Sequence, residues 1–375
     1  MYPKHLYIHW PFCTFKCHYC DFVAFEQHAQ FQESYHKVLL QEIDAFAIQN
    51  DQAKSTPINT IFIGGGTPSL YHLPWITELF ATLNQKFNLT TTTEITIETN
   101  PADIDEERLE TWREIGINRL SVGVQSLNDD VLLKLNRRQR ASDVQRVMRI
   151  APKYFDNISV DMILGLPDIT SDEWFATLKQ IVTWPIKHIS VYFLTIHEKT
   201  PLYFKVQRGD TKLIDDEAMV TLYEKTVNLL EQSGFEQYEI SNFAKQGYQS
   251  THNQAYWDRK PYKGFGVGAA SFDGQMRITN DNNLSRYLDA EARPTIQEKL
   301  TRQQEIIELL MLGLRQKKGL DLHHMVYFLN ESEKKQFEHN VSTMAQAELI
   351  EKAGENIRLT LKGMALENEV IVRLL

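Results

Sequence analysis

Residues 7–22 read YIHWPFCTFKCHYCDF and contain all three cysteines of the 375-residue chain. Cys13, Cys17 and Cys20 follow the spacing C-x3-C-x2-C. Each iron of a [4Fe–4S] cube takes one protein sulfur, so three thiolates hold three irons and leave the fourth iron without a cysteine. An iron of this kind is free to take another ligand. The pattern therefore predicts a cluster that binds a reactant at its fourth iron, more than one that only stores electrons.

Disulfide bonds and a zinc site are the two other uses that the cysteines could have. An odd number of cysteines and the absence of any sign of secretion argue against disulfides. A zinc site with His9 or His18 as the fourth ligand is an alternative. Zinc sites usually use C-x2–4-C pairs separated by a longer span, so the spacing favours the cluster and leaves zinc open.

The composition is that of a globular protein with a substantial core. Hydrophobic residues make up 42% of the chain and charged residues 24%. The length predicts two domains. A formal net charge of −9 argues against a general nucleic-acid binder. We find neither a signal-peptide pattern nor an apolar run of about 20 residues, so no transmembrane segment is expected. Three free thiolates predict a cytoplasmic location.

Six expected strands alternate with helices in the first part of the chain. The strands are residues 6–10, 59–63, 94–100, 119–126, 158–164 and 188–196. Such alternation predicts an α/β fold with parallel strands and right-handed crossovers. A doubly wound sheet and a barrel both satisfy it, and periodicity alone does not choose between them.

A second, smaller domain follows. A glycine-rich segment at residues 264–272 leads into an expected hairpin at residues 273–274. From residue 301 the pattern is three helices, a strand at residues 356–361 and a last helix, which is a winged-helix-like, α+β order. We therefore expect domains at residues 1–245 and 246–375.

Residues 64–68 read GGGTP and follow the second expected strand. Glycines at such a turn allow positive φ and a close approach of the backbone to a ligand. The segment lacks the spacing of a P-loop and of a dinucleotide fingerprint. Taken alone, it is also compatible with an ordinary turn.

The C-x3-C-x2-C spacing, with Tyr19 before the last cysteine, resembles the radical S-adenosylmethionine (SAM) superfamily. The resemblance implies that the open iron binds the amino and carboxylate groups of SAM, and it favours a partial, TIM-like (β/α)6 barrel. The GGGTP segment then matches a glycine-rich turn whose backbone binds the SAM amino group, at Gly65, Gly66 and Thr67.

Further residues match the coproporphyrinogen dehydrogenase-like branch of that superfamily in order and spacing. The resemblance implies SAM contacts by Glu98, Gln125, Arg137 and Asp161, with Tyr7 and Tyr19 beside the cluster. Arg137 would hold the SAM carboxylate by paired hydrogen bonds, and Asp161 would accept from the ribose. In this superfamily, an electron from the reduced cluster cleaves SAM and yields a 5′-deoxyadenosyl radical.

Two members of that branch are distinguished by the cysteine loop. Oxygen-independent coproporphyrinogen III dehydrogenase, which decarboxylates a porphyrin precursor, has a fourth cysteine two residues after the third and a long N-terminal extension. Here Phe22 stands at that position, and only twelve residues precede Cys13. Both departures argue against dehydrogenase activity, and no catalytic residue is assigned.

Residues 252–257 read HNQAYW and resemble the H-N-x-x-Y-W signature of the HemW family of haem chaperones. The resemblance implies that His252 ligates haem iron and that Tyr256 and Trp257 cover the macrocycle. The nearby basic residues Arg259, Lys260 and Lys263 would pair with haem propionates. Without the resemblance, these residues would be a polar loop histidine and a solvated basic loop.

The resemblance thus implies a cytoplasmic protein that binds haem and delivers it to apo forms of respiratory haem proteins, with a [4Fe–4S] cluster and SAM serving the transfer. It also suggests a cluster-linked homodimer and leaves room for peripheral membrane contact. The alternatives are the coproporphyrinogen III dehydrogenase reaction and a radical reaction on some other substrate.

Overall fold

Six parallel strands in chain order form the centre of the computed structural model, which describes residues 2–289 and 295–375. They are β1 (His5–Trp10), β4 (Thr60–Gly65), β5 (Glu94–Thr99), β6 (Arg119–Gln125), β7 (Asn157–Leu164) and β8 (His188–Phe193). A doubly wound sheet would reverse its strand order at a switch point. The order here never reverses within these six strands, which confirms the partial barrel.

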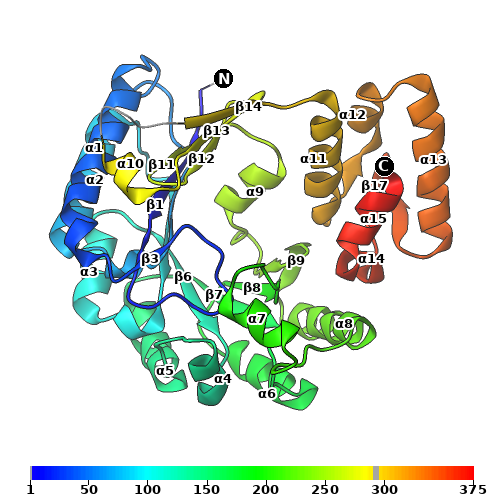
Figure 1. Cartoon of the computed structure of the whole chain (residues 1–375), viewed down its shortest axis with the longest axis horizontal. Coiled ribbons are helices and arrows are strands. Elements are labelled where there is room, and N and C mark those ends of the chain that lie inside the picture. The colour runs from blue at the N-terminus through cyan, green and yellow to red at the C-terminus, as the bar shows by residue number, and fades with distance from the viewer. Residues whose placement is uncertain (1, 290–294) are drawn as a thin grey trace.

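Helices follow one another around the outside of this curved sheet, from blue to green in Figure 1. They are α1 (Gln32–Ile48), α2 (Leu73–Lys86), α3 (Glu106–Glu114), α4 (Asp129–Lys134), α5 (Ala141–Ile150), α6 (Ser171–Ile181), α7 (Pro201–Gln207) and α8 (Asp216–Gln232). Local sequence fixes where they begin. For example, Thr170 and Glu173 form a capping box that starts α6. Short 3-10 turns lie at Ala29–Phe31, Pro68–Leu70, Pro101–Asp103 and Ala151–Lys153.

Along each barrel strand, successive side chains face alternately the hydrophobic core and a cavity inside the barrel. Apolar side chains such as Ile8, Ile61 and Val160 are completely buried in the hydrophobic core. The residues between them line a cavity and are mostly polar or small. This inner set is Tyr7, Phe62, Glu98, Ser121, Gly123, Asp161, Ser190 and Tyr192. Because side chains alternate between the two faces of a strand, one sequence pattern builds both the core and the cavity wall.

The main sheet continues beyond the barrel at both ends to give twelve strands. β11 (Tyr262–Phe265) pairs in parallel with β1, and β12 (Ala270–Phe272), β13 (Met276–Asn280) and β14 (Thr295–Lys299) follow antiparallel. β12 and β13 confirm the hairpin expected at residues 273–274. On the other edge, β10 (Asn242–Ala244) pairs with β8 and with β9 (Glu236–Glu239). The sheet therefore spans position 245, and the expected domain division there stays a prediction.

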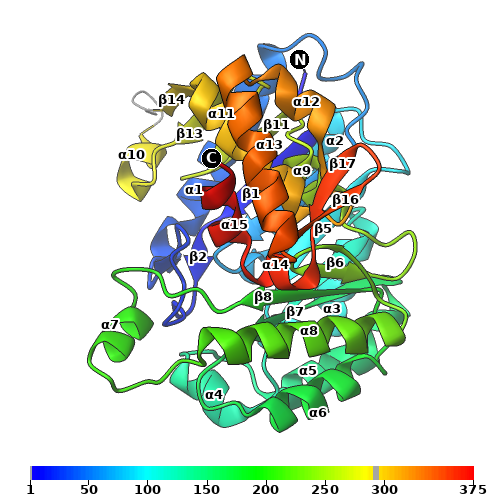
Figure 2. The same ribbon diagram turned by 90° about the vertical axis from the view of Figure 1, so that its right-hand side faces the viewer.

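The C-terminal part forms a separate group of helices on a small sheet, orange and red in Figures 1 and 2. Its helices are α11 (Arg302–Arg315), α12 (Leu322–Tyr327), α13 (Glu331–Gln346), α14 (Leu361–Ala365) and α15 (Glu367–Leu374). β15 (Leu320–Asp321), β17 (Asn356–Leu359) and β16 (Ile350–Ala353) form its three-stranded antiparallel sheet. This order of elements agrees with the winged-helix-like expectation.

Four short elements connect these parts. β2 (Phe12–Cys13) and β3 (Phe25–Glu26) flank the cysteine loop, and α10 (Leu284–Leu288) lies near α1. α9 (Thr251–Trp257) lies between the barrel and α11, and it packs on β4 as well as on α11. Among the described residues, no helix combines the length and apolar character needed to cross a bilayer.

Candidate functional site

A cavity of about 560 Å³ opens inside the barrel, and the cysteine loop forms part of its wall. Cys13, Cys17 and Cys20 all line it and are partly exposed. The backbone of the loop is fixed to the barrel by hydrogen bonds, since His18 N–H donates to Leu135 O (3.0 Å) and the Asn136 side chain donates through Nδ2 to Lys16 O (2.9 Å). The structure therefore brings the three cysteines to the carboxyl-terminal end of the parallel strands, where barrel chemistry is usually located.

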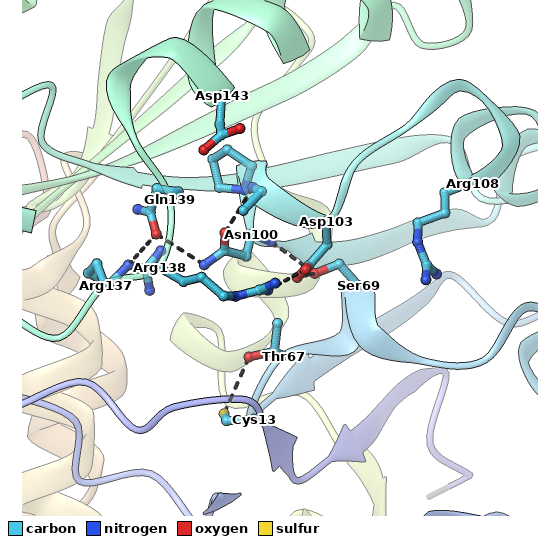
Figure 3. A network of polar contacts seen from close by, with 12 residues as sticks. Cys13, Thr67, Ser69, Asn100, Asp103, Arg108, Arg137, Arg138, Gln139 and Asp143 are labelled. Atoms are coloured by element: carbon cyan, nitrogen blue, oxygen red, sulfur yellow. Dashed lines mark hydrogen bonds and ion pairs between the residues drawn. The ribbon is translucent and has the colours of Figure 1, made fainter. Parts of the chain in front are cut away.

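Two barrel residues donate to the cysteine sulfurs, and Figure 3 shows one of these contacts. Thr67 Oγ1 lies 3.3 Å from Cys13 Sγ, and Arg137 Nη1 lies 3.6 Å from Cys17 Sγ. Burial raises the pKa of the Cys13 thiol to about 11, while the Thr67 hydroxyl acts in the opposite direction. Iron binding would displace the thiol protons, and donors aimed at sulfur suit the resulting thiolates. The donor set thus fits an iron–sulfur cluster.

Of the two histidines proposed as zinc ligands, His9 has both ring nitrogens engaged and His18 has one. His9 Nε2 bonds to Val23 O (2.7 Å) and its Nδ1 bonds to the Tyr7 hydroxyl (2.9 Å). His18 Nδ1 bonds to Lys134 O (2.8 Å). Within residues 2–289 and 295–375, no three His, Cys, Asp or Glu side chains gather around a single metal position. This geometry gives the zinc alternative no fourth ligand at His9.

The GGGTP segment joins the end of β4 to the cysteine loop. Gly66 N–H donates to Trp10 O (2.7 Å), and Thr67 N–H donates to Phe12 O (3.0 Å). A Cβ on Gly66 would lie 2.7 Å from the carbonyl carbon and oxygen of Pro11, so only glycine allows this approach. Gly65 has φ +114°, a backbone conformation that residues with a side chain rarely adopt, so glycine is favoured at this position too. The glycines therefore set the position of the loop.

Two carboxylates face the cavity from neighbouring parts of the barrel. Gly65 N–H donates to Glu98 Oε2 (3.2 Å), and Ser121 Oγ donates to Asp161 Oδ2 (2.9 Å). Burial raises the pKa of Glu98 to about 8, and repulsion from the Asp161 carboxylate makes a smaller contribution to this rise. Burial also raises the pKa of Asp161. Among the described residues, Asp161 Oδ1 is buried without a hydrogen-bond partner. An unpaired acceptor beside a second carboxylate suits a ligand with hydroxyl groups and positive charge, as SAM has.

Arg137 is held by an amide and carbonyl network, shown in Figure 3. Its Nε donates to Gln139 Oε1 (2.9 Å), and its Nη2 donates to Gly123 O (2.8 Å). Asn100 Nδ2 also donates to Gln139 Oε1 (3.1 Å). Gln139 and Asn100 are positioning residues that the sequence reasoning missed. The one sequence feature that pointed to them was that Gln139 is close to Arg137 in the sequence and Asn100 is close to Glu98.

The remaining expected SAM contacts also line the cavity. Gln125 follows a register shift between β6 and β7 and has φ +63°, which is uncommon for a residue other than glycine. Tyr7 and Tyr19 both face the cavity, and burial raises the pKa of each hydroxyl well above its usual range. All nine residues expected at a SAM site therefore lie around one space.

His252 reaches the same cavity from the opposite end of β4. Its Nδ1 is 2.7 Å from Thr60 Oγ1, and its Nε2 is 2.9 Å from the Tyr256 hydroxyl. The Phe62 ring stacks on it at 5.1 Å between centroids. The residue is 1% exposed, and burial lowers its pKa to about 3. His252 is thus a neutral imidazole with both nitrogens engaged.

The helix that carries His252 is fastened to the C-terminal part. Gln316 Nε2 donates to Trp257 O (3.1 Å), and Lys318 pairs with Asp258 (2.6 Å) just beyond α9. The basic residues expected to meet propionates pair with carboxylates of the protein instead. The pairs are Arg259 with Glu308 (3.2 Å), Lys260 with Asp258 (3.2 Å) and Lys263 with Glu42 (3.6 Å).

Comparison with known proteins gives two family matches. The radical SAM superfamily matches residues 7–181, and the HemN C-terminal domain matches residues 300–366. Several proteins named heme chaperone HemW are similar to this chain over most of their length. The one from Bacillus subtilis is 34% identical and covers 98% of both chains, and the one from Lactococcus lactis is 30% identical and covers 100% of this chain and 97% of that one.

A solved structure shares the architecture. Coproporphyrinogen III oxidase (HemN) from Escherichia coli, described as a radical SAM enzyme, superposes with a TM-score of 0.83 at 25% identity. The match covers 99% of this chain and 90% of that chain. The likeness therefore extends through the barrel and the C-terminal part together.

Proposed function

The chain belongs to the HemW family of radical SAM-fold proteins, and from this we propose that it binds haem and delivers it to respiratory haem proteins. The observation that carries the proposal is the similarity to proteins named heme chaperone HemW along 98% of this chain and of the Bacillus subtilis relative. We place this activity in the cytoplasm, with at most peripheral membrane contact.

We assign the [4Fe–4S] cluster to Cys13, Cys17 and Cys20. SAM would lie in the adjoining cavity, and together the two cofactors supply one-electron cleavage to a 5′-deoxyadenosyl radical. Asp161 offers its unpaired carboxylate oxygen to this ligand, and Glu98 offers a second carboxyl group beside it. Arg137 would orient the SAM carboxylate. The remaining expected contacts are Tyr7, Tyr19, Gly65, Gly66, Thr67 and Gln125.

We assign His252 as the haem-iron ligand, as its H-N-x-x-Y-W context implies. Neutral imidazole is the form that ligates haem iron. Thr60 and Tyr256 occupy both ring nitrogens, so ligation requires one of them to be released. Tyr256 lies on α9 with His252, whereas Thr60 lies on β4, so movement of α9 away from β4 would release Nδ1. We therefore propose that the structure corresponds to a closed state, which opens when haem is bound through His252.

The test is a haem titration of the cluster-reconstituted protein, followed through the Soret band. His252→Ala should lower the affinity at least ten-fold. His188→Ala is a matched control, since His188 is also fully buried and bonded through both nitrogens, to Ser159 (2.7 Å) and Tyr238 (2.8 Å). Haem binding by the His252 variant at the strength of the control would show that the assignment is wrong.

A second candidate is the coproporphyrinogen III dehydrogenase reaction, favoured by the TM-score of 0.83 to HemN. Phe22, which replaces the additional cysteine, is 63% exposed at the end of the cysteine loop. Anaerobic incubation with coproporphyrinogen III, SAM and a reductant should yield no protoporphyrinogen. Product formation would favour the enzyme, and 5′-deoxyadenosine released only with another substrate would favour a different radical reaction.

We also propose a homodimer linked through the clusters. The molecular mass in solution, measured with and without cluster reconstitution, tests this state. A mass that does not depend on the cluster would contradict the linkage.

A further inference from the structure

A second histidine lies on the same cavity, at its outer part near the cysteine loop. His197 belongs to the segment between β8 and α7 and lines the cavity. Its side chain is 39% exposed, whereas His252 is almost completely buried. A large ligand can therefore reach His197 while α9 is in place.

The imidazole of His197 is oriented in the way common among metal-ligating histidines. Its Nδ1 lies 3.1 Å from Asp21 Oδ2, directly after Cys20. A carboxylate on one ring nitrogen fixes the tautomer and leaves the other nitrogen as a ligand. Among residues 2–289 and 295–375, none forms a hydrogen bond with His197 Nε2. The free nitrogen is thus the one that a metal would take.

The backbone around His197 is fixed against the cysteine loop. Thr200 donates to His197 O through its hydroxyl (2.7 Å) and through its N–H (3.3 Å). Lys199 takes φ +68° to allow this turn. Leu202 N–H donates to His18 O (2.9 Å), inside the cysteine loop. The position of His197 therefore follows that of the loop, and no rearrangement is needed to present it.

The surroundings of His197 match the chemistry of haem, a flat apolar ring with an iron and two carboxylates. Phe15 and Phe22, both in the cysteine loop, line the same cavity and are 52% and 63% exposed. Exposed aromatic side chains gathered at a cavity are typical of a ligand surface. Lys16 lines the cavity too, and its ammonium group lies at the exposed edge, 2.9 Å from Phe22 O. It supplies positive charge for a propionate.

We propose that haem first docks at this outer part of the cavity, with its iron on His197 Nε2, before α9 opens and His252 becomes available. The inference rests on the proposed haem-carrier function. It adds a second ligand and an order of events, in which the His197 complex precedes the His252 complex.

The test uses the full-length, cluster-reconstituted protein mixed rapidly with ferric haem, with the Soret band recorded over time. The parent should show a fast phase followed by a slower one. His197→Ala should lower the amplitude or rate of the fast phase at least ten-fold. His252→Ala should retain the fast phase and lose the slow one. His72→Ala, which removes an exposed histidine that does not line the cavity, should behave as the parent.

Two further variants guard against structural loss. His197→Gln keeps a donor for Asp21 but is a poor iron ligand, and it should reproduce the His197→Ala defect with full iron content. Asp21→Asn should weaken the fast phase about ten-fold, as loss of an orienting partner does. A fast phase equal to that of the parent in both His197 variants would overturn the inference while leaving the carrier function intact. Absence of haem binding by the parent would overturn both.

Discussion

The guanidinium carbon of Arg315 lies 4.6 Å from the centre of the Trp257 ring. The same arginine forms an ion pair with the completely buried Glu239 (2.7 Å) and donates to Ser241 Oγ (3.0 Å). Arg315 also pairs with Glu367 of α15 (3.6 Å). It therefore joins four parts of the molecule, namely α11, α15, the β9–β10 edge of the sheet and the end of α9. Through α9 it also holds His252 inside the barrel.

Removing this contact should loosen α9. Arg315→Ala alone would leave Glu239 as an unpaired buried charge, at a cost of about 3–5 kcal/mol, so the change is made in a Glu239→Gln background. Loss of a desolvated cation–π contact of about 2 kcal/mol should raise amide exchange in α9 roughly ten-fold or more. Hydrogen exchange of the double variant, compared with Glu239→Gln alone, measures this. Equal exchange rates would show that Arg315 does not hold the helix.

Gly66→Ala should prevent cluster assembly. Its Cβ would lie 2.7 Å from two backbone atoms of Pro11, so the cysteine loop has to move away from β4. We expect iron content to fall to a small fraction of the parent value, with the helical and strand content unchanged by circular dichroism. Thr67→Ala removes only the hydroxyl beside Cys13, and it should bind iron fully but lose it to a chelator about ten-fold faster. Full iron content in the glycine variant would refute the steric argument.

The raised pKa of Glu98 predicts that the ligand-free chain becomes less stable as pH rises. In the unfolded chain this carboxyl ionises near its usual pKa of 4.5, but in the folded chain it stays protonated until about pH 8. The folded state therefore binds more protons between these values, and stability falls across that window and levels off above it.

Glu98→Gln should remove much of that pH dependence. Each unit of pKa difference corresponds to about 1.4 kcal/mol, so near pH 9 the variant should exceed the parent by a few kcal/mol in free energy of unfolding. Near pH 5 the two proteins should be similar. Urea unfolding of the cluster-free proteins from pH 5 to 9 provides the measurement, and parallel pH profiles would contradict the burial-based shift.

Two substitutions of Gln125 separate the effect of its strained backbone on stability from the effect of its side chain on SAM binding. At φ +63° glycine carries no steric penalty, so Gln125→Gly should be as stable as the parent or more stable by up to about 1 kcal/mol. Gln125→Ala keeps the strained conformation and should gain nothing. If the side chain contacts SAM, both variants should bind SAM more weakly by the same factor in equilibrium dialysis. Unchanged SAM affinity in both would remove Gln125 from the site.

The barrel and the residues that line its cavity could be predicted because the sequence patterns that indicate them are local. The six strands read as short apolar or alternating segments, and Glu98 and Asp161 stand in the carboxyl-terminal halves of two of them. Arg137 follows a third strand after the short helix α4. Parallel order then brings the carboxyl-terminal ends together without further information. The three glycines of residues 64–66 indicated a close backbone approach or an ordinary turn, and the structure shows the close approach at Gly66.

The surroundings of His252 could not be predicted because its partners are distant in the sequence. Its Nδ1 bonds to Thr60, 192 residues earlier, and no periodic pattern connects the two. The pairing of Lys263 with Glu42 and of Arg259 with Glu308 is hidden in the same way. β11 and β12 are also too short to show a strand period, so the sequence indicated the hairpin at residues 273–274 but not the pairing of β11 with β1.

The position of β1 between β4 and β11 affects how the chain folds during its synthesis on the ribosome. Tyr7 is opposite Phe62 on one side and opposite Gly264 on the other. The strand that leads into the cysteine loop thus lacks one neighbour until more than half of the chain has been translated. At about 5–20 residues per second this delay is of the order of tens of seconds. Cluster insertion is accordingly expected only after this delay, and until then the three thiols need protection from oxidation.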